Sequence, residues 1–258
     1  MWRLLLVALC VGCASAETLR FFVHIPKTGG TTFRHIFAQD CNRTWTFLAN
    51  APGTAHDISL IRTLLIENYT CFQGHMSWEL VDIARRTFTE HNISTFVLLR
   101  EPVDRLISQY YYEQTIFDTN YEAEEFMALN ANTVARYLGE DAIEVVRSRA
   151  TYVGLTGFYH ETLSYLLAVG FLNNYDAVVN YNMRKVHQRR ASVEVRGLAV
   201  EYTDKDRIIY GEAQGRFFDQ QLGSIGNSTL YTRALHDLNS LPHVCKSDDA
   251  GIGSGRCW

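Results

Sequence analysis

The sequence predicts an α/β fold, a single domain with a central parallel sheet flanked by helices. Two nearly continuous apolar runs, Leu19 to Ile25 and Thr95 to Leu99, have the character of strands buried on both faces of a parallel sheet. Each run is followed by a segment with helical features, and strands that alternate with helices form parallel sheets. The chain of 258 residues is 47% hydrophobic and 20% charged, as in ordinary soluble globular proteins.

The predicted elements follow in a regular order. Helices are predicted over residues 31–39, 57–67, 77–90, 102–117 and 203–222. Asp57, Ser77 and Thr203 are expected to cap three of them, because a short polar side chain can accept a hydrogen bond from the first helical turn. Pro102 suits the first turn of the helix that it begins. Asp176 to Val179 is predicted to be a third strand.

The chain divides into three parts. Residues 1–16 combine a positive charge at Arg3, a short apolar run and small residues ending in Ala16, which is the order of a secretory signal peptide. The apolar run is short for a membrane span, and an uncleaved anchor is the alternative; only in that case is membrane contact expected. Residues 17–238 form the predicted domain, and residues 239–258 a glycine-rich tail.

Four cysteines follow the predicted signal peptide: Cys41, Cys71, Cys245 and Cys257. Four cysteines allow three pairings, and the sequence does not choose between them. Cys41–Cys71 and Cys245–Cys257 are favoured because each pair closes a short loop. The second bond would also restrain the tail.

Four Asn-x-Ser/Thr motifs indicate passage through the secretory pathway. They stand at Asn42, Asn68, Asn92 and Asn227. Behind a signal peptide, such motifs are acceptors of N-linked glycans. We therefore expect a glycoprotein of the Golgi lumen or a secreted glycoprotein, modified at some of these positions.

The strongest chemical motif is the loop His24-Ile-Pro-Lys-Thr-Gly-Gly-Thr-Thr-Phe33 between the first strand and its helix. Ligands of such sheets bind at the carboxyl ends of the strands, and glycines let backbone amides approach an anion. The predicted anion-binding residues are Lys27, Thr28, Gly29, Gly30, Thr31 and Thr32. Because Lys27 precedes the glycines, the loop is not a Walker A motif. A tight turn with a solvated lysine is the alternative.

A second motif follows the other strand, where Arg100 ends the apolar run and Ser108 lies two turns into the next helix. An arginine at a strand end and a serine on the adjacent helix can grip a second phosphate. The alternative is an Arg100–Asp104 ion pair beside an ordinary exposed serine.

Together the two motifs resemble the sulfotransferase superfamily. Lys27 to Thr32 is similar to its 5′-phosphosulfate loop, and Arg100, Pro102 and Ser108 match its 3′-phosphate element. The chain resembles in particular the Golgi heparan sulfate 2-O- and 6-O-sulfotransferases and uronyl 2-O-sulfotransferase, over roughly residues 19–222. The resemblance implies a P-loop-like fold that binds the donor 3′-phosphoadenosine 5′-phosphosulfate (PAPS). It also implies an anionic polysaccharide acceptor of the glycosaminoglycan kind.

The resemblance assigns two further roles. In similar glycan sulfotransferases a histidine in the setting of Gln-Gly-His-Met-Ser-Trp78 is the general base, which here is His75. Imidazole suits this role because it titrates near neutral pH. A structural histidine at a helix start is the alternative. A late loop closes over the nucleotide in these enzymes, and Arg184 and Lys185 could do so here; glycan binding by this basic cluster and a solvated loop are the alternatives.

Other function classes fit less well. The net charge of −4 gives no polycationic footprint for nucleic acid, and no nucleic-acid partner is expected. No carboxylate set suits Mg²⁺, so no metal is expected. A P-loop kinase-like NTPase, a catalytically silent glycan-binding homologue and a sulfotransferase that acts on protein tyrosine or a small molecule are the rival hypotheses. The acceptor sugar, its hydroxyl and the oligomeric state are left open by the sequence.

Overall fold

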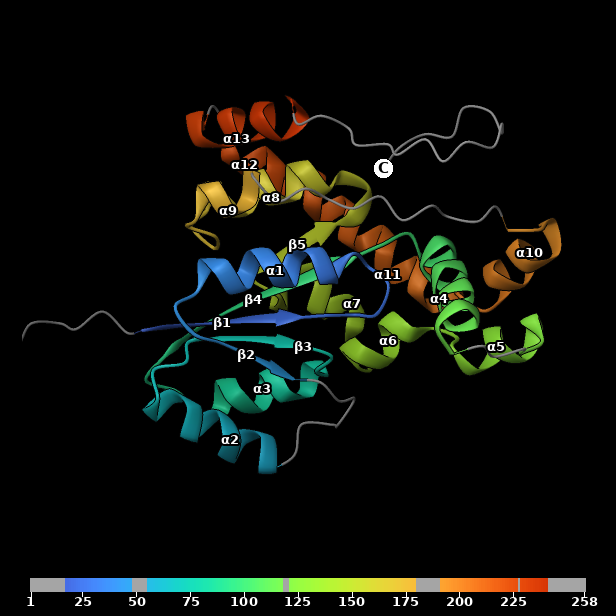
Figure 1. The fold of residues 1–258 in the computed structure, drawn as a ribbon, viewed down its shortest axis with the longest axis horizontal. Helices are drawn as coiled ribbons and strands as arrows, with labels where there is room; N and C mark the ends of the chain where they lie inside the picture. The colour runs from blue at the N-terminus through green and yellow to red at the C-terminus, as the bar shows by residue number, and fades with distance from the viewer. Residues whose placement is uncertain (1–16, 48–54, 118–120, 180–190, 227, 241–258) are drawn as a thin grey trace, which may run out of the picture.

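Five parallel strands form one sheet in the order β2-β3-β1-β4-β5 in the computed structural model of the chain (Figure 1). The structure describes residues 17–47, 55–117, 121–179, 191–226 and 228–240. The strands are β1 (Thr18–Val23), β2 (Thr44–Phe47), β3 (Cys71–Gly74), β4 (Asn92–Leu99) and β5 (Tyr152–Leu155). All four neighbouring pairs are parallel, so the carboxyl ends of all five strands lie at one edge.

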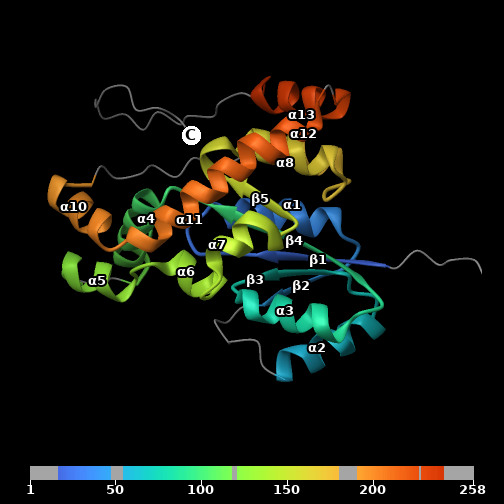
Figure 2. The ribbon, with the colours of Figure 1, turned by 180° about the vertical axis from the view of Figure 1, so that it is seen from behind.

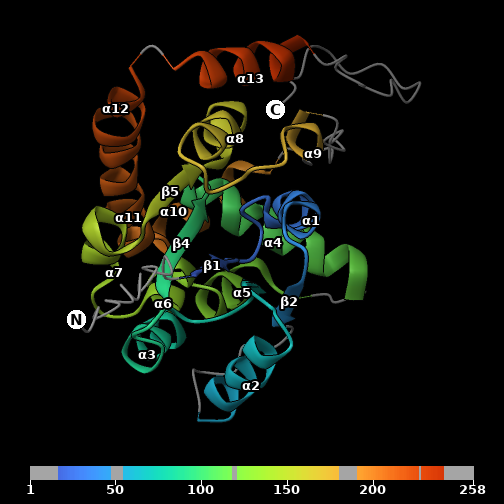
Figure 3. The same cartoon turned by 90° about the vertical axis from the view of Figure 1, so that its left-hand side faces the viewer.

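Helices cover both faces of the sheet. One face is covered by α1 (Gly30–Asp40), α8 (Tyr159–Ala168), α9 (Tyr175–Val179) and α13 (Thr229–Ser240). The other is covered by α2 (Ala55–Ile66), α3 (Trp78–Thr87), α6 (Thr133–Leu138), α7 (Ala142–Glu144) and α11 (Asp204–Gly215). Figure 3 shows α1, α8 and α9 on one side of the strands and α2 and α3 on the other. This is the predicted fold class, a parallel sheet between helical layers.

Alternation along β1 explains the two layers. Phe21 and Val23 are buried in the core under α2 and α3, whereas Phe22 is buried in the core under α1 and α8. A strand whose successive side chains point to opposite covered faces must be apolar at every position, which is why its sequence is a continuous apolar run.

A third group of helices stands beyond the carboxyl edge: α4 (Pro102–Phe117), α5 (Ala123–Leu129) and α10 (Val193–Glu201), with a core of their own. In Figures 1 and 2 this group lies at the end of the molecule toward which the arrow of β1 points. Glu101 caps the start of α4, since its carboxylate accepts hydrogen bonds from the amides of Val103 (3.2 Å) and Asp104 (2.8 Å). The group therefore faces the loops that leave the strands.

Shorter helical segments complete the chain. They are a π-helix over Val145–Arg149, a 3₁₀ turn over Thr156–Phe158, a second π-helix over Arg216–Leu222 and α12 (Gly223–Ile225). Among the described residues, no helix has both the length and the hydrophobicity that a membrane span requires. The predicted signal peptide lies outside the described residues.

The strands predicted over 19–25 and 95–99 are confirmed as β1 and β4, and the helix predicted from Pro102 to Phe117 has the bounds of α4. The third strand predicted over Asp176 to Val179 is wrong, because this segment is the helix α9. Asn174 caps that helix by accepting a hydrogen bond from the amide of Ala177 at 2.9 Å. A segment of four residues is too short for periodicity to separate a strand from a helical turn.

Thr203 occupies the predicted N-cap position of α11, but its side chain makes no capping hydrogen bond. The Thr203 hydroxyl donates backward to the carbonyl of Ala199 (2.7 Å), and the amides of Lys205 and Asp206 bond instead to the side chain of Asn132. The long helix predicted over 203–222 consists of α11 followed by the π-helix. Ser77 stands at the start of α3 without a capping bond.

The domain end predicted at residue 238 falls inside α13, which continues to Ser240. Asn239 is held to α8, because its side chain bonds to that of His160 at 2.9 Å. The remainder of the predicted tail, with the Cys245–Cys257 pair, lies outside the described residues.

The disulfide predicted between Cys41 and Cys71 is confirmed, with Cα atoms 6.3 Å apart and a sequence separation of 30. It ties the end of α1 to β3. Replacing both cysteines by alanine is expected to lower the free energy of unfolding by about 3.5 kcal/mol, since the bond restricts the unfolded chain. Thermal unfolding should show this as a fall in Tm of about 7–14 °C. An unchanged Tm would contradict the bond.

Candidate active site

Loops from four strands meet at the carboxyl edge of the sheet. Arg100, after β4, donates a hydrogen bond from Nη1 to the carbonyl of Lys27, after β1, at 3.2 Å. The hydroxyl of Thr156, after β5, donates to the carbonyls of Thr28 and Leu99. His75, after β3, bonds to the carbonyl of His24. The two motifs that the sequence separates by 73 residues therefore form one site.

The backbone of the β1–α1 loop has the shape expected of an anion-binding loop. Lys27 has a φ of 67° and Gly29 a φ of 85°, both in the left-handed region. A Cβ on Gly30 would lie 2.0 Å from the ring of His24, so only glycine fits there. The chain can therefore turn directly into α1 and present the amides of its first turn at the edge of the sheet.

The three threonines of this loop differ in their surroundings. Thr28 is buried, and its hydroxyl donates to the carbonyl of Ile25 at 2.9 Å, so it braces the loop. Thr31 is exposed and Thr32 half-buried in the first turn of α1. Within the described residues neither hydroxyl has a hydrogen-bond partner, and both are available to a ligand at the helix start.

The two histidines of the site form a stacked pair. Their ring centroids are 4.5 Å apart with an interplanar angle of 24°, and His75 Nδ1 lies 2.8 Å from the carbonyl of His24. Because a carbonyl only accepts, His75 Nδ1 carries the proton in this bond, and Nε2 keeps a lone pair when the ring is neutral. His75 is therefore held in the tautomer that can accept a proton at Nε2.

Burial disfavours the charged form of both rings. Burial lowers the pKa of His75, and nearby Arg34 lowers it further, while the bond to the His24 carbonyl partly offsets these effects. The pKa of His24 is lowered to about 3, mainly by burial and then by the charges of His75, Arg34 and Lys27. His75 is thus a free base at pH values below its ordinary pKa.

Gly74 sets the position of His75. It has a φ of 133°, and a Cβ there would lie 2.1 Å from the carbonyl oxygen of Phe47 at the end of β2. The same carbonyl accepts a hydrogen bond from the amide of His75 at 3.3 Å. The close approach of β2 and β3 therefore turns His75 toward His24.

Lys27 and Arg100 carry two positive charges that are near enough to affect each other. Burial lowers the pKa of Lys27, Arg100 lowers it further, and Glu113 partly raises it. The Lys27 ammonium lies 3.6 Å from the ring centroid of Tyr112 on α4. Adjacent cations that share no direct carboxylate are the arrangement expected where anionic groups of a ligand bind.

Ser108 is half-buried on α4 and has no hydrogen-bond partner within the described residues. The Arg100–Asp104 ion pair considered as an alternative does not form. Asp104 instead pairs with Arg196 on α10 at 3.2 Å, although Asp104 and Glu101 are near enough to raise the pKa of Arg100 against the effect of burial. Apart from its bond to the Lys27 carbonyl, the Arg100 guanidinium is therefore available to bind a ligand.

Arg34 is the site residue that the sequence analysis missed. It follows Gly30 by four residues, so it lies on the face of α1 that covers His24. Its Nε is buried and, within the described residues, has no hydrogen-bond partner. The i, i+4 relation to Gly30 is the signal that could have identified it. Arg184 and Lys185, predicted to contact the nucleotide, lie outside the described residues.

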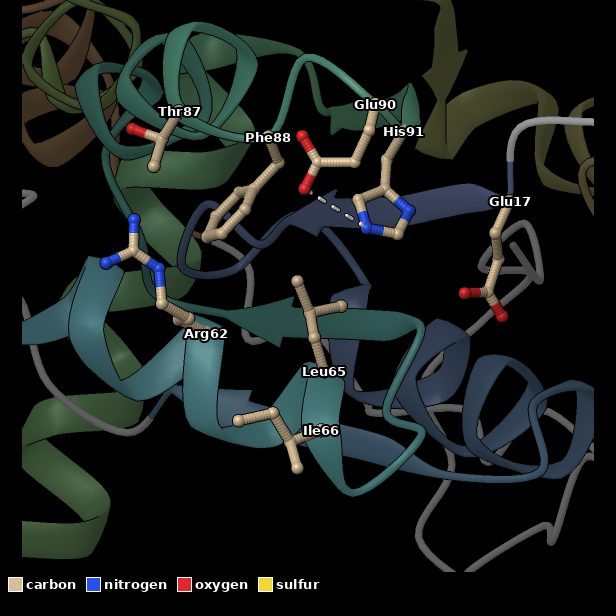
Figure 4. Close-up of a pocket in the computed structure, with 8 residues that line it drawn as sticks. All are labelled: Glu17, Arg62, Leu65, Ile66, Thr87, Phe88, Glu90 and His91. Atoms are coloured by element: carbon tan, nitrogen blue, oxygen red, sulfur yellow. Dashed lines mark ion pairs between the residues drawn. The ribbon is translucent and has the colours of Figure 1, made fainter.

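A cavity of about 410 Å³ lies at the opposite edge of the sheet, where the strands begin (Figure 4). Glu17, which precedes β1, and Phe88 and His91, which precede β4, line it together with Leu65 of α2. It contains none of the predicted site residues. The chemistry of the chain therefore points to the carboxyl edge.

The described residues also contain no cluster of three or more His, Cys, Asp or Glu side chains able to hold a metal.

The comparison with protein families agrees with this geometry. The model described as the sulfotransferase family matches residues 19–188, which is more than half of the chain. The matched segment includes the β1–α1 loop, His75, Arg100 and Ser108, and it supports sulfotransfer as the general activity. A comparison with curated proteins gave no significant match. The chain therefore belongs to the sulfotransferase family.

Proposed function

We propose that this protein transfers the sulfuryl group of PAPS to a hydroxyl of an anionic glycan, with His75 as the general base. The proposal depends on one observation, the contact between Arg100 and Lys27 at the ends of adjacent strands. A donor with a 5′-phosphosulfate and a 3′-phosphate needs two anion sites at one edge of the sheet. Sulfotransferases in general use PAPS.

The residues present fit this donor. Gly29 and Gly30 leave a cradle that a Cβ on Gly30 would close, and the amides of α1 begin there. Lys27 would contact the 5′-phosphosulfate, and Arg100 and Ser108 would hold the 3′-phosphate. When bound, PAPS supplies the activated sulfuryl group. Lys27 and the loop amides then stabilise the negative charge that develops on the leaving phosphate.

His75 supplies the acid–base step. A sugar hydroxyl becomes a good nucleophile as its proton moves to His75 Nε2, while a new oxygen–sulfur bond forms and the bond from sulfur to the 5′-phosphate oxygen breaks. The bond from Nδ1 to the His24 carbonyl keeps Nε2 free for that proton and stabilises the imidazolium that results. The proton leaves with water before the next cycle.

Arg34 supports an acidic acceptor. A buried guanidinium nitrogen without a partner is costly, and such groups in native structures are usually completed by a ligand or water. The location of Arg34 beside the histidine pair suits a carboxylate or sulfate of the acceptor chain.

Replacing Arg34 by glutamine is expected to raise KM for an acidic polysaccharide about tenfold, since a charged hydrogen bond is lost. PAPS affinity should change little. The pKa of His75 should rise, because a nearby positive charge is removed, and the acid limb of the pH–rate profile should move to higher pH. Arg86→Gln on the exposed side of α3 is the matched control. An equal effect of both substitutions would argue against an acceptor site at Arg34.

We also propose passage through the secretory pathway. The Cys41–Cys71 disulfide supports an oxidising compartment. Asn42, Asn68 and Asn92 are exposed and stand just before or at the start of β2, β3 and β4. Glycans on them would leave the carboxyl edge clear. Asn227 lies outside the described residues.

Calorimetry tests the donor half of the proposal. The protein is expected to bind 3′-phosphoadenosine 5′-phosphate (PAP) without added metal, and to bind ATP with Mg²⁺ much more weakly. The reverse order would favour a kinase-like NTPase. Transfer of radiolabelled sulfate to a panel of desulfated polysaccharides tests the acceptor half. Donor binding without transfer to any acceptor would favour a catalytically silent homologue.

A further inference from the structure

Tyr112 carries the ammonium group of Lys27 on the face of its ring. The distance from Nζ to the ring centroid is 3.6 Å, which is well inside the range of a cation–π interaction. Tyr112 is 45% exposed on α4, so it is not needed to fill a core. The sulfotransfer chemistry proposed above assigns it no role.

The backbone of the loop directs Lys27 to this ring. Lys27 has a φ of 67°, in the left-handed region that L-residues rarely adopt. The hydrogen bonds from Arg100 to the Lys27 carbonyl and from Thr156 to the Thr28 carbonyl hold the loop in this shape. The side chain therefore leaves the loop toward α4.

The charges around Lys27 explain why an aromatic ring at Tyr112 would stabilise its ammonium group. Burial and Arg100 from the end of β4 disfavour the charged ammonium and lower the pKa of Lys27, whereas Glu113 on α4 favours the charged form. An aromatic face adds a second favourable contact without forming an ion pair that a donor would have to break. Ser108 and Tyr112 also share one face of α4, because they are four residues apart.

We propose that Tyr112 is a positioning residue, whose ring holds the charged ammonium of Lys27 at the entrance of the donor site, one helical turn from Ser108. This inference rests on the role of Lys27 in the proposed function. It adds that α4 organises both ends of the donor site, the 3′-phosphate end through Ser108 and the sulfuryl end through Tyr112.

The direct test follows the titration of Lys27 by NMR, and the sequence favours it because the chain has only four lysines, at positions 27, 185, 205 and 246. Protein labelled with ¹³C-lysine gives one Cε signal for each, and Lys27→Arg identifies the signal of Lys27. Tyr112→Leu is expected to lower the pKa of Lys27 by about half a pH unit, since the ring stabilises the cation. Tyr112→Phe keeps the ring and should restore the value.

Tyr121→Leu is the matched control, because Tyr121 is similarly exposed at 40% and holds no cation among the described residues. If the pKa of Lys27 is the same in Tyr112→Leu as in Tyr121→Leu, Tyr112 does not position the lysine and the inference is wrong. A loss of fold would show in the Lys205 signal and in the circular dichroism of the variant. If Tyr112→Leu does not fold, Tyr112→Phe provides the test. This variant keeps the ring, so a change in the pKa of Lys27 would overturn the inference.

Kinetics give a second readout. Tyr112→Leu should lower kcat about two- to fivefold with little change in the KM for acceptor, and Tyr112→Phe should recover most of it. The two proposals fail separately. If the wild-type protein transfers no sulfate, the proposed function fails, whereas the response of the Lys27 titration to Tyr112→Leu tests the positioning role in the absence of turnover.

Discussion

Replacing His75 by alanine is expected to reduce kcat by on the order of 10²-fold or more, the usual effect of losing a general base. PAP affinity should stay within about twofold, because the role proposed for His75 is toward the acceptor and the donor loop is also held by Arg100 and Thr156. Sulfate transfer to a polysaccharide acceptor gives kcat, and calorimetry with PAP gives the affinity.

The pH dependence provides a second measure of the same residue. Burial and Arg34 lower the pKa of His75, so the neutral base persists below pH 6.5. The acid limb of kcat/KM is therefore expected below that pH in the wild type, and the residual activity of His75→Ala should lack it. His236→Ala, an exposed histidine on α13, serves as the control. Near-normal turnover of His75→Ala with intact PAP binding would remove His75 from the mechanism.

Replacing Lys27 by alanine is expected to lower kcat by on the order of 10²–10³-fold. An ammonium beside the transferred group stabilises charge that develops only as the sulfur–oxygen bond breaks, so its loss affects the transition state more than the bound donor. PAP affinity should therefore weaken much less than kcat falls. Single-turnover sulfate transfer separates the chemical step from product release.

Two controls keep this result interpretable. Lys205→Ala removes an exposed lysine of α11 and should leave turnover unchanged. Lys27→Gly removes the same charge but suits the left-handed backbone at this position, so it should lose as much activity as Lys27→Ala. Recovery of turnover in the glycine variant would mean that backbone strain, and not the missing charge, caused the loss. A loss confined to PAP affinity would make Lys27 a binding residue only.

The local parts of the site could be predicted from the sequence. Strands β1 and β4 are read from apolar runs, and α4 from Pro102, because periodicity and proline geometry act within a few residues. Gly29 and Gly30 likewise mark a turn whatever surrounds it. Such features depend on neighbouring residues along the chain, and the structure confirms the two strands and the helix.

Other parts depend on residues distant in the sequence. Asp206, in the first turn of α11, accepts hydrogen bonds from the amides of Val134 and Ala135 at the start of α6. Strands β2 and β5 are four residues each and exist because they pair with β3 and β4. A run of four residues does not indicate which strand it pairs with, so the sequence did not predict these two edge strands.

The sequence by itself determined two strand–loop–helix units, β1 to α1 and β4 to α4, and predicted which of their residues would bind anions. Only the tertiary structure decided that these units share a site. The order β2-β3-β1-β4-β5 puts β3 and β4 on either side of β1, so His75 and Arg100 meet the β1–α1 loop from opposite sides. That order is set by burial of both faces of the sheet, which depends on all of its helices at once.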